Sequence, residues 1–179
     1  MIDLEELAEL NPIDLALLLT DRVPTWTAEP AVRWRAVLEL FTSRLASSDR
    51  RVTPEEVAQL RAAYEALVAG ASGAGALDGR ESVLRRVNML VALARSAADP
   101  AIDDLAAAAR RTVLESLPLS IESARVKASN WRALPADEVR DLRYAKNLLG
   151  PLRSIAGDGR RPDDSADLDA WLQLLPSLP

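Results

Sequence analysis

The chain has 179 residues, of which 49% are hydrophobic and 27% are charged, and its net charge is -5. These proportions exclude an intrinsically disordered chain and predict a folded protein that buries a core of ordinary size. Because only 4% of the residues are aromatic, leucine, alanine and valine must fill most of that core.

The chain contains no histidine and no cysteine. This removes disulfide bonds, thiolate metal sites, thiol nucleophiles and the commonest general base. Catalysis would have to use carboxylates, lysine, serine, tyrosine or a hard cation, and these residues form no catalytic motif that we can identify. We therefore expect no enzymatic activity, no catalytic residues, no metal and no cofactor.

The N-terminal sequence, Met-Ile-Asp-Leu-Glu-Glu-Leu, is acidic, whereas a signal peptide begins with basic residues followed by an apolar run. No apolar run approaches the roughly 18 residues that a membrane span requires. We therefore expect a cytoplasmic protein with no membrane partner. Lys127 and Lys146 are the only lysines beside many arginines, a bias typical of GC-rich bacterial coding.

Apolar residues recur at helical spacing along most of the chain, and no segment shows the alternation of a β-strand. We predict helices over residues 4–10, 12–20, 31–48, 54–70, 82–97, 101–117, 120–134, 135–149 and 166–175. The fold class is therefore all-α, an irregular multi-helix bundle of about eight or nine helices. Helix starts at Asn11, Thr53 and Asp99 recur at roughly the period of helical-hairpin repeats, so a short solenoid is the alternative.

The helix predicted over 82–97 is apolar around most of its circumference, so neighbours must cover it on several sides. We expect it to be the centre of the bundle. The clearest start signal is Thr53-Pro54-Glu55-Glu56, in which Thr53 caps the helix and Glu56 completes a capping box. Residues 71–79, rich in glycine, alanine and serine, are predicted to form a flexible loop and a hinge.

The chain is predicted to form one all-α domain over residues 1–156, a linker over 157–165 and a short C-terminal helix within 166–179. One side of that last helix carries Leu168, Trp171, Leu172 and Leu175. Such a helix either packs back on its own domain or docks into a partner with Trp171 as the anchor. The exposure of Trp171 distinguishes the two arrangements.

Charge is distributed unevenly along the chain. Residues 1–30 are strongly acidic, whereas the basic residues gather between 124 and 161. They are Arg125, Lys127, Arg132, Arg140, Arg143, Lys146, Arg153, Arg160 and Arg161. Arg125 and Arg132 are two turns apart on one predicted helix, and Arg140 and Arg143 are i,i+3 neighbours on the next, so together they can form a stripe. The alternative is a solvated surface whose charge is balanced by neighbouring acids and by the acidic N-terminus.

The most favoured function is a non-enzymatic protein–protein interaction module: an adaptor, a regulator or a small helical subunit of a larger assembly, with self-association also open. The predicted partner-binding residues are Arg125, Arg132, Arg140, Arg143, Lys146, Trp171, Leu172 and Leu175. The second hypothesis is contact with a nucleic-acid backbone through the arginine-rich segment 125–161. The third is a small-ligand-binding helical protein or a magnesium-dependent enzyme, which would require a pocket with convergent polar groups.

Overall fold

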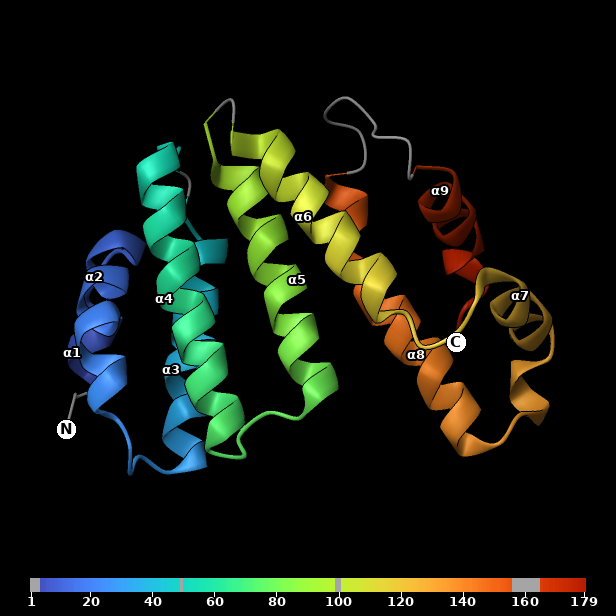
Figure 1. Cartoon of the computed structure of the whole chain (residues 1–179), viewed down its shortest axis with the longest axis horizontal. Coiled ribbons are helices and arrows are strands. Elements are labelled where there is room, and N and C mark those ends of the chain that lie inside the picture. Colours follow the sequence, from blue (N-terminus) through green and yellow to red (C-terminus); the bar gives the residue numbers. More distant parts are fainter. Residues whose placement is uncertain (1–3, 49, 99–100, 156–164) are drawn as a thin grey trace.

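The computed structural model describes residues 4–48, 50–98, 101–155 and 165–179 (Figure 1). Within these ranges the elements are α1 (Leu4–Ala8), α2 (Pro12–Arg22), η1 (Val23–Thr25), α3 (Ala31–Ala46), α4 (Pro54–Gly73), α5 (Gly79–Ser96), α6 (Ala101–Ser116), α7 (Ile121–Ser129), η2 (Trp131–Ala133), α8 (Ala136–Leu149), η3 (Pro151–Ser154), α9 (Ser165–Leu174) and η4 (Leu175–Ser177). The elements labelled η are short 3-10 helices. The predicted all-α, multi-helix bundle is confirmed. None of the described helices is long and apolar enough to span a bilayer.

Helix α5 occupies the centre of the bundle, as its sequence predicts. It contacts α3, α4, α6, α8 and η3, and Val87, Met89, Leu90 and Leu93 on it are buried. Helices α1 to α4 lie on one side of α5, whereas α7 and α9 lie at the far end of the long axis of the molecule (Figure 1). The acidic N-terminal helix α1 and the basic region of α7 and α8 are therefore at opposite ends.

Side-chain caps begin the helices where the sequence predicts. The Asn11 side chain accepts hydrogen bonds from the backbone N–H groups of Ile13 and Asp14. Thr53 and Glu56 form both hydrogen bonds of the capping box at the start of α4. Each satisfies donors that a helix terminus leaves unpaired. The third predicted start, at Asp99 and Pro100, lies outside the described residues.

The prediction that the fourth helix ends at Gly70 is wrong, because α4 continues to Gly73. Gly70 lies inside the helix, directly against the indole ring of Trp34: a Cβ placed on Gly70 would overlap Cη2 and Cζ3 of that ring. The glycine is therefore required for close helix packing and does not mark a helix end. Trp34 also contacts Trp26 edge to face, with 5.3 Å between ring centroids.

The flexible loop predicted over 71–79 is much shorter in the structure. Residues 71–73 belong to α4, and Gly79 already begins α5. Ala76 and Leu77, in the remaining connection, are buried, and the Ala76 N–H donates to the carbonyl oxygen of Ala71 at 2.8 Å. Because this connection is packed against the core, its structure differs from the flexible hinge that the sequence predicts.

Two further details differ from the sequence predictions. The apolar spacing of α3 predicts that Val32 points inward together with Trp34, Val37 and Phe41, but Val32 is 72% exposed. The buried face of α3 runs through Trp34, Val37 and Phe41, and a residue two positions before Trp34 lies on the opposite side of a helix. The helix predicted to reach residue 134 ends at Ser129, and the 3-10 turn η2 follows.

A short parallel backbone bridge joins Val52, before α4, to Ala97, after α5. The Val52 N–H donates to the carbonyl oxygen of Ser96, and the Ala98 N–H donates to that of Val52, both at 2.9 Å. Nη1 of Arg51 donates to the Ala97 carbonyl oxygen at 3.0 Å. The connection between α3 and α4 is therefore held against the end of the central helix.

The C-terminal helix α9 packs on the chain's own domain. Leu168, Trp171, Leu175 and Leu178 are all buried, with Trp171 only 4% exposed, and α9 contacts α7. Nζ of Lys146 in α8 donates to the carbonyl oxygen of Leu178 at 2.9 Å. The predicted linker over 157–165 lies outside the described residues except for Ser165, which begins α9.

Candidate functional site

Arg125, Arg132, Arg140 and Arg143 are all exposed, and we call them the α7–α8 arginine surface. Arg140 and Arg143 are one turn apart on α8. Arg125 lies on α7, whereas Arg132 lies in η2, where its guanidinium is 5.5 Å from the centroid of the Trp131 ring. The prediction that Arg125 and Arg132 share one helix is therefore wrong, because α7 ends before Arg132.

Two of the acids expected to balance this surface, Glu138 and Asp141, pair with other residues, whereas the exposed Asp137 lies one turn before Arg140 on α8 and forms no ion pair in the described ranges. Asp141 pairs with Arg80 at 2.6 Å, and Glu138 pairs with Lys127 at 2.8 Å. The acidic helix α1 lies at the other end of the molecule (Figure 1). Within the described ranges, none of the four arginines has a carboxylate oxygen within ion-pair distance.

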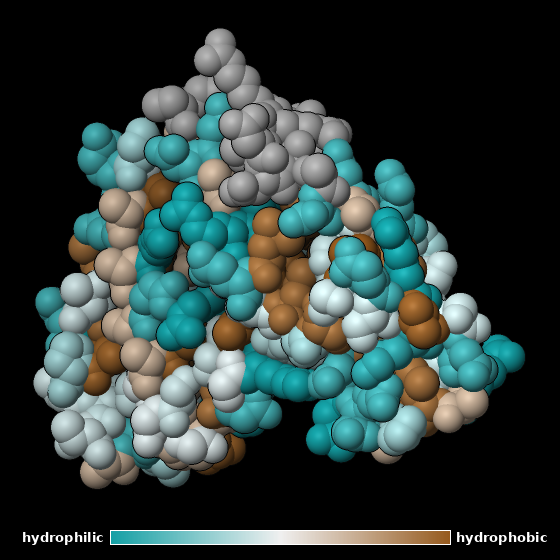
Figure 2. Space-filling model, turned by 45° about the vertical axis from the view of Figure 1, so that its right-hand side comes forward, coloured by the Kyte–Doolittle hydropathy of each residue, from teal (hydrophilic) through white to brown (hydrophobic). Residues whose placement is uncertain are grey.

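Arginines elsewhere in the structure are more often paired. Ion pairs involve Arg33, Arg35, Arg50, Arg80, Arg85 and Arg86. Figure 2 turns the end that carries α7 and α8 toward the viewer, and its lower edge there is mostly hydrophilic, with small apolar spots between. The four residues of the α7–α8 arginine surface are thus exposed, positively charged and not in an ion pair with any described carboxylate.

The other predicted partner-binding residues have different surroundings. The Lys146 ammonium group is engaged by the Leu178 carbonyl oxygen. Trp171 and Leu175 are buried, and Leu172 is half-buried against the core. In this arrangement Trp171 contacts its own domain, so binding a partner through it would require α9 to detach. Arg160 and Arg161, also in the predicted basic segment, lie outside the described residues.

A cavity of about 500 Å³, which the sequence analysis missed, lies between the end of α3, the segment before α4, the second half of α5 and η3. It is lined by Thr42, Leu45, Ala46, Ser48, Arg50, Arg51, Asn88, Val91, Ala92, Arg95, Ser96 and Pro151. Three of these residues are arginines, and none of the described lining residues is acidic. The adjacent Arg50 and Arg51 before a helix cap were a signal in the sequence, but their proximity to Arg95 depends on the Val52–Ala97 bridge.

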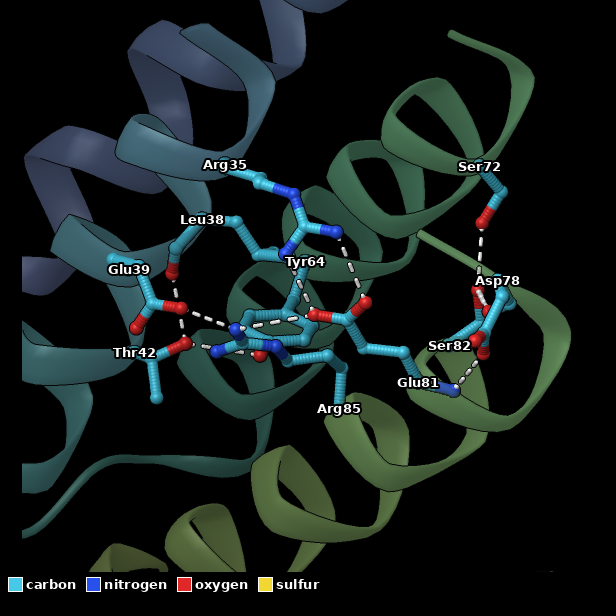
Figure 3. Close-up of polar contacts among 10 residues, drawn as sticks. All are labelled: Arg35, Leu38, Glu39, Thr42, Tyr64, Ser72, Asp78, Glu81, Ser82 and Arg85. Carbon is cyan, nitrogen blue, oxygen red and sulfur yellow. Dashed lines mark hydrogen bonds and ion pairs between the residues drawn. The ribbon is translucent and has the colours of Figure 1, made fainter. Parts of the chain in front are cut away.

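Next to the cavity, a polar network joins α3, α4 and α5 (Figure 3). Arg85 pairs with both Glu39 and Glu81, and Arg35 donates to the two oxygens of Glu81 at 3.0 and 3.2 Å. The hydrogen bond to Glu39 is the largest contribution that raises the pKa of Arg85, so this guanidinium stays charged. These paired charges link α3 to α5.

A separate pair of hydroxyl groups, on Thr42 and the buried Tyr64, joins α3 to α4. The two hydroxyl oxygens are 3.0 Å apart, and Thr42 also donates to the Leu38 carbonyl oxygen. Burial raises the pKa of Tyr64 above its ordinary value of 10.0, which keeps the phenol neutral. Among the described residues, no buried side-chain nitrogen or oxygen lacks a hydrogen-bond partner. A network in which every group is satisfied stabilises the bundle and offers no activated nucleophile.

The acidic pair Asp103–Asp104 lies exposed in the first turn of α6. In the part of the chain that the structure describes, no three acidic side chains come together as a metal-ligand group. Comparison with protein-family models, curated protein sequences and solved structures finds no match to this chain.

Proposed function

We propose that the protein is a non-enzymatic helical module that binds an acidic segment of a partner protein through the α7–α8 arginine surface. The observation that supports this proposal is the positive charge on Arg125, Arg132, Arg140 and Arg143, none of which forms an ion pair with a described carboxylate. Guanidinium groups bind carboxylates through two parallel hydrogen bonds. A partner that supplies carboxylates would complete these pairs.

An acidic protein segment fits the chain better than a nucleic acid does. The net charge of the whole chain is -5, whereas nucleic-acid-binding domains are usually basic overall. The acidic α1 helix lies away from the arginines, so it leaves a compact partner undisturbed but repels a long phosphate backbone that extends along the molecule. An adaptor, regulator or small subunit acting in the cytoplasm fits this proposal, and the lack of cysteine is in keeping with a reducing compartment.

The test is fluorescence anisotropy of a labelled glutamate-rich peptide, with labelled DNA and RNA, single-stranded and duplex, as competing probes. We expect the peptide to bind at about 50 mM salt and to bind less well at about 200 mM. The double variant Arg140→Glu/Arg143→Glu should weaken peptide binding by about tenfold or more, because each charge-assisted hydrogen bond contributes roughly 1.5 to 3 kcal/mol.

The matched control is Arg22→Glu/Arg61→Glu, which changes the net charge equally at two exposed arginines on α2 and α4. This variant should retain most of the peptide affinity. Equal losses in both double variants, or no peptide binding by the unaltered chain, would contradict the proposal. Preferential binding of DNA or RNA that depends on Arg140 and Arg143 would replace it with the nucleic-acid alternative.

A further inference from the structure

The cavity between α3, α5 and η3 has the size and the lining of a small-molecule site. Its volume of about 500 Å³ falls within the range of pockets that hold small ligands, about 300 to 1,000 Å³. It lies on other elements than the α7–α8 arginine surface, so the two sites are independent. Its most distinctive feature is the gathering of Arg50, Arg51 and Arg95.

The backbone fixes two of these arginines in place. Arg51 precedes Val52, whose bridge to Ala97 holds the segment against the end of α5, where Arg95 also lies. Arg51 donates one N–H to the Ala97 carbonyl oxygen. A guanidinium carries five N–H donors, so the others stay available. Arg95 forms no hydrogen bond or ion pair with any described residue.

The third arginine is held by a carboxylate that a ligand can displace. Nη2 of Arg50 lies 2.6 Å from Oε1 of Glu56, and the Arg50 side chain is 65% exposed. Oε2 of Glu56 accepts a hydrogen bond from the Thr53 N–H, so Glu56 also completes the capping box. An anion in the cavity therefore competes with Glu56 for Arg50 while the cap of α4 stays in place.

We infer that this cavity binds a small organic phosphate, whose phosphate group lies among the three arginines. A phosphate monoester carries close to two negative charges and three acceptor oxygens near neutral pH, which suits several guanidinium groups better than a single carboxylate does. Leu45, Val91 and Pro151 provide an apolar wall for the organic part of the ligand.

The probes are phenyl phosphate and inorganic phosphate, titrated into the full chain by calorimetry at low ionic strength. Phenyl phosphate should bind, and more tightly than inorganic phosphate, because its ring contacts the apolar wall. Arg95→Gln should weaken binding about tenfold, the loss of one charge-assisted hydrogen bond. Arg111→Gln, at an exposed arginine of α6 outside the cavity, is the matched control and should bind as the unaltered chain does.

Glu56→Gln provides a second test, because it should strengthen ligand binding, whereas Arg95→Gln should weaken it. Glutamine can keep the capping box, because it also accepts from the Thr53 N–H, but it releases Arg50 from its ion pair. Phenyl phosphate should then bind several-fold more tightly. Glu55→Gln is the control, since it removes the same charge from the neighbouring exposed residue, which forms no ion pair in the described ranges. Circular dichroism should show unchanged helix content in both variants.

The inference is overturned if neither probe binds, if Arg111→Gln weakens binding as much as Arg95→Gln does, or if Glu55→Gln and Glu56→Gln have the same effect. In these cases the cavity is only a surface depression. A phosphate-induced shift of the Arg95 Nε–H resonance, absent for Arg111, would place the bound anion in the cavity. None of these outcomes depends on the α7–α8 arginine surface.

Discussion

The ammonium group of Lys146, in α8, donates a hydrogen bond to the backbone carbonyl oxygen of Leu178, at the end of the chain. This contact and the burial of Leu178 hold the C-terminal segment against the bundle. The segment after α9 thus returns to the last turn of α8. The C-terminal helix, whose sequence also allows a detachable anchor, is integrated into the domain.

We predict that Trp171→Ala lowers the free energy of unfolding by about 3 to 5 kcal/mol, because it removes a large buried side chain from the core. Urea denaturation followed by circular dichroism measures this change. Gln173→Ala, at an exposed position of the same helix, is the control and should change stability by less than about 0.5 kcal/mol. Equal stability of the two variants would mean that α9 does not pack as described.

Gly70→Ala should destabilise the protein by about 1 to 3 kcal/mol, because the added Cβ collides with the rigid indole ring of Trp34 and overpacks the α3–α4 contact. Gly73→Ala tests the same substitution in the same helix at a position where nothing lies within 4 Å of the new Cβ. It should leave stability unchanged or raise it by up to about 1 kcal/mol. Thermal unfolding measures both changes as shifts of the unfolding midpoint. Equal shifts in the same direction for the two variants would contradict this account.

The phenol of Tyr64 makes stability depend on alkaline pH. Its pKa in the folded state is raised, first by burial, above the ordinary value of 10.0, so the folded state holds this proton more tightly than the unfolded state does. The stabilisation is fully present below pH 10.0 and is lost as the pH rises through the folded-state pKa. The Tyr64→Phe variant should cost about 1 kcal/mol at neutral pH, through the lost hydrogen bond to Thr42.

Above pH 10 the difference in unfolding free energy between the unaltered chain and Tyr64→Phe should narrow, since only the unaltered chain loses this contribution. Burial also raises the pKa of Tyr144, and this contribution is common to both proteins. Urea denaturation at a series of alkaline pH values measures the difference. A constant difference across the series would mean that Tyr64 does not titrate with unfolding.

Local features of the fold could be predicted from the sequence because they depend on residues close together in the chain. Helical spacing of apolar residues predicts the helices, and the caps at Asn11 and Thr53 depend on side chains within a few positions of the backbone groups they bind. The central position of α5 followed from its broad apolar surface. Gly70 was misassigned as a helix end because its reason, the close approach of Trp34, lies in another helix.

The candidate sites depend on contacts between distant parts of the chain, and these were mostly not predictable. The exposure of Arg140 and Arg143 follows from their helix, but their lack of an ion pair with any described carboxylate depends in part on Arg80 and Lys127, which pair with Asp141 and Glu138. The arginines of the cavity come from two segments that are far apart in the sequence and are joined by the Val52–Ala97 bridge. Whether α9 packs on its own domain or on a partner depends on which surface complements its apolar side. Residues far from α9 in the sequence form that surface, so no local sequence pattern predicts it.

The bridge between Val52 and Ala97 also has a consequence for how the protein opens. Because the amide hydrogens of Val52 and Ala98 are both held by acceptors on the other segment, neither can exchange with solvent until the end of α5 and the connection before α4 separate. Hydrogen–deuterium exchange should therefore give these two amides a common free energy of opening. Although the segment between α3 and α4 is short and irregular, it then belongs to the same cooperative opening unit as the central helix.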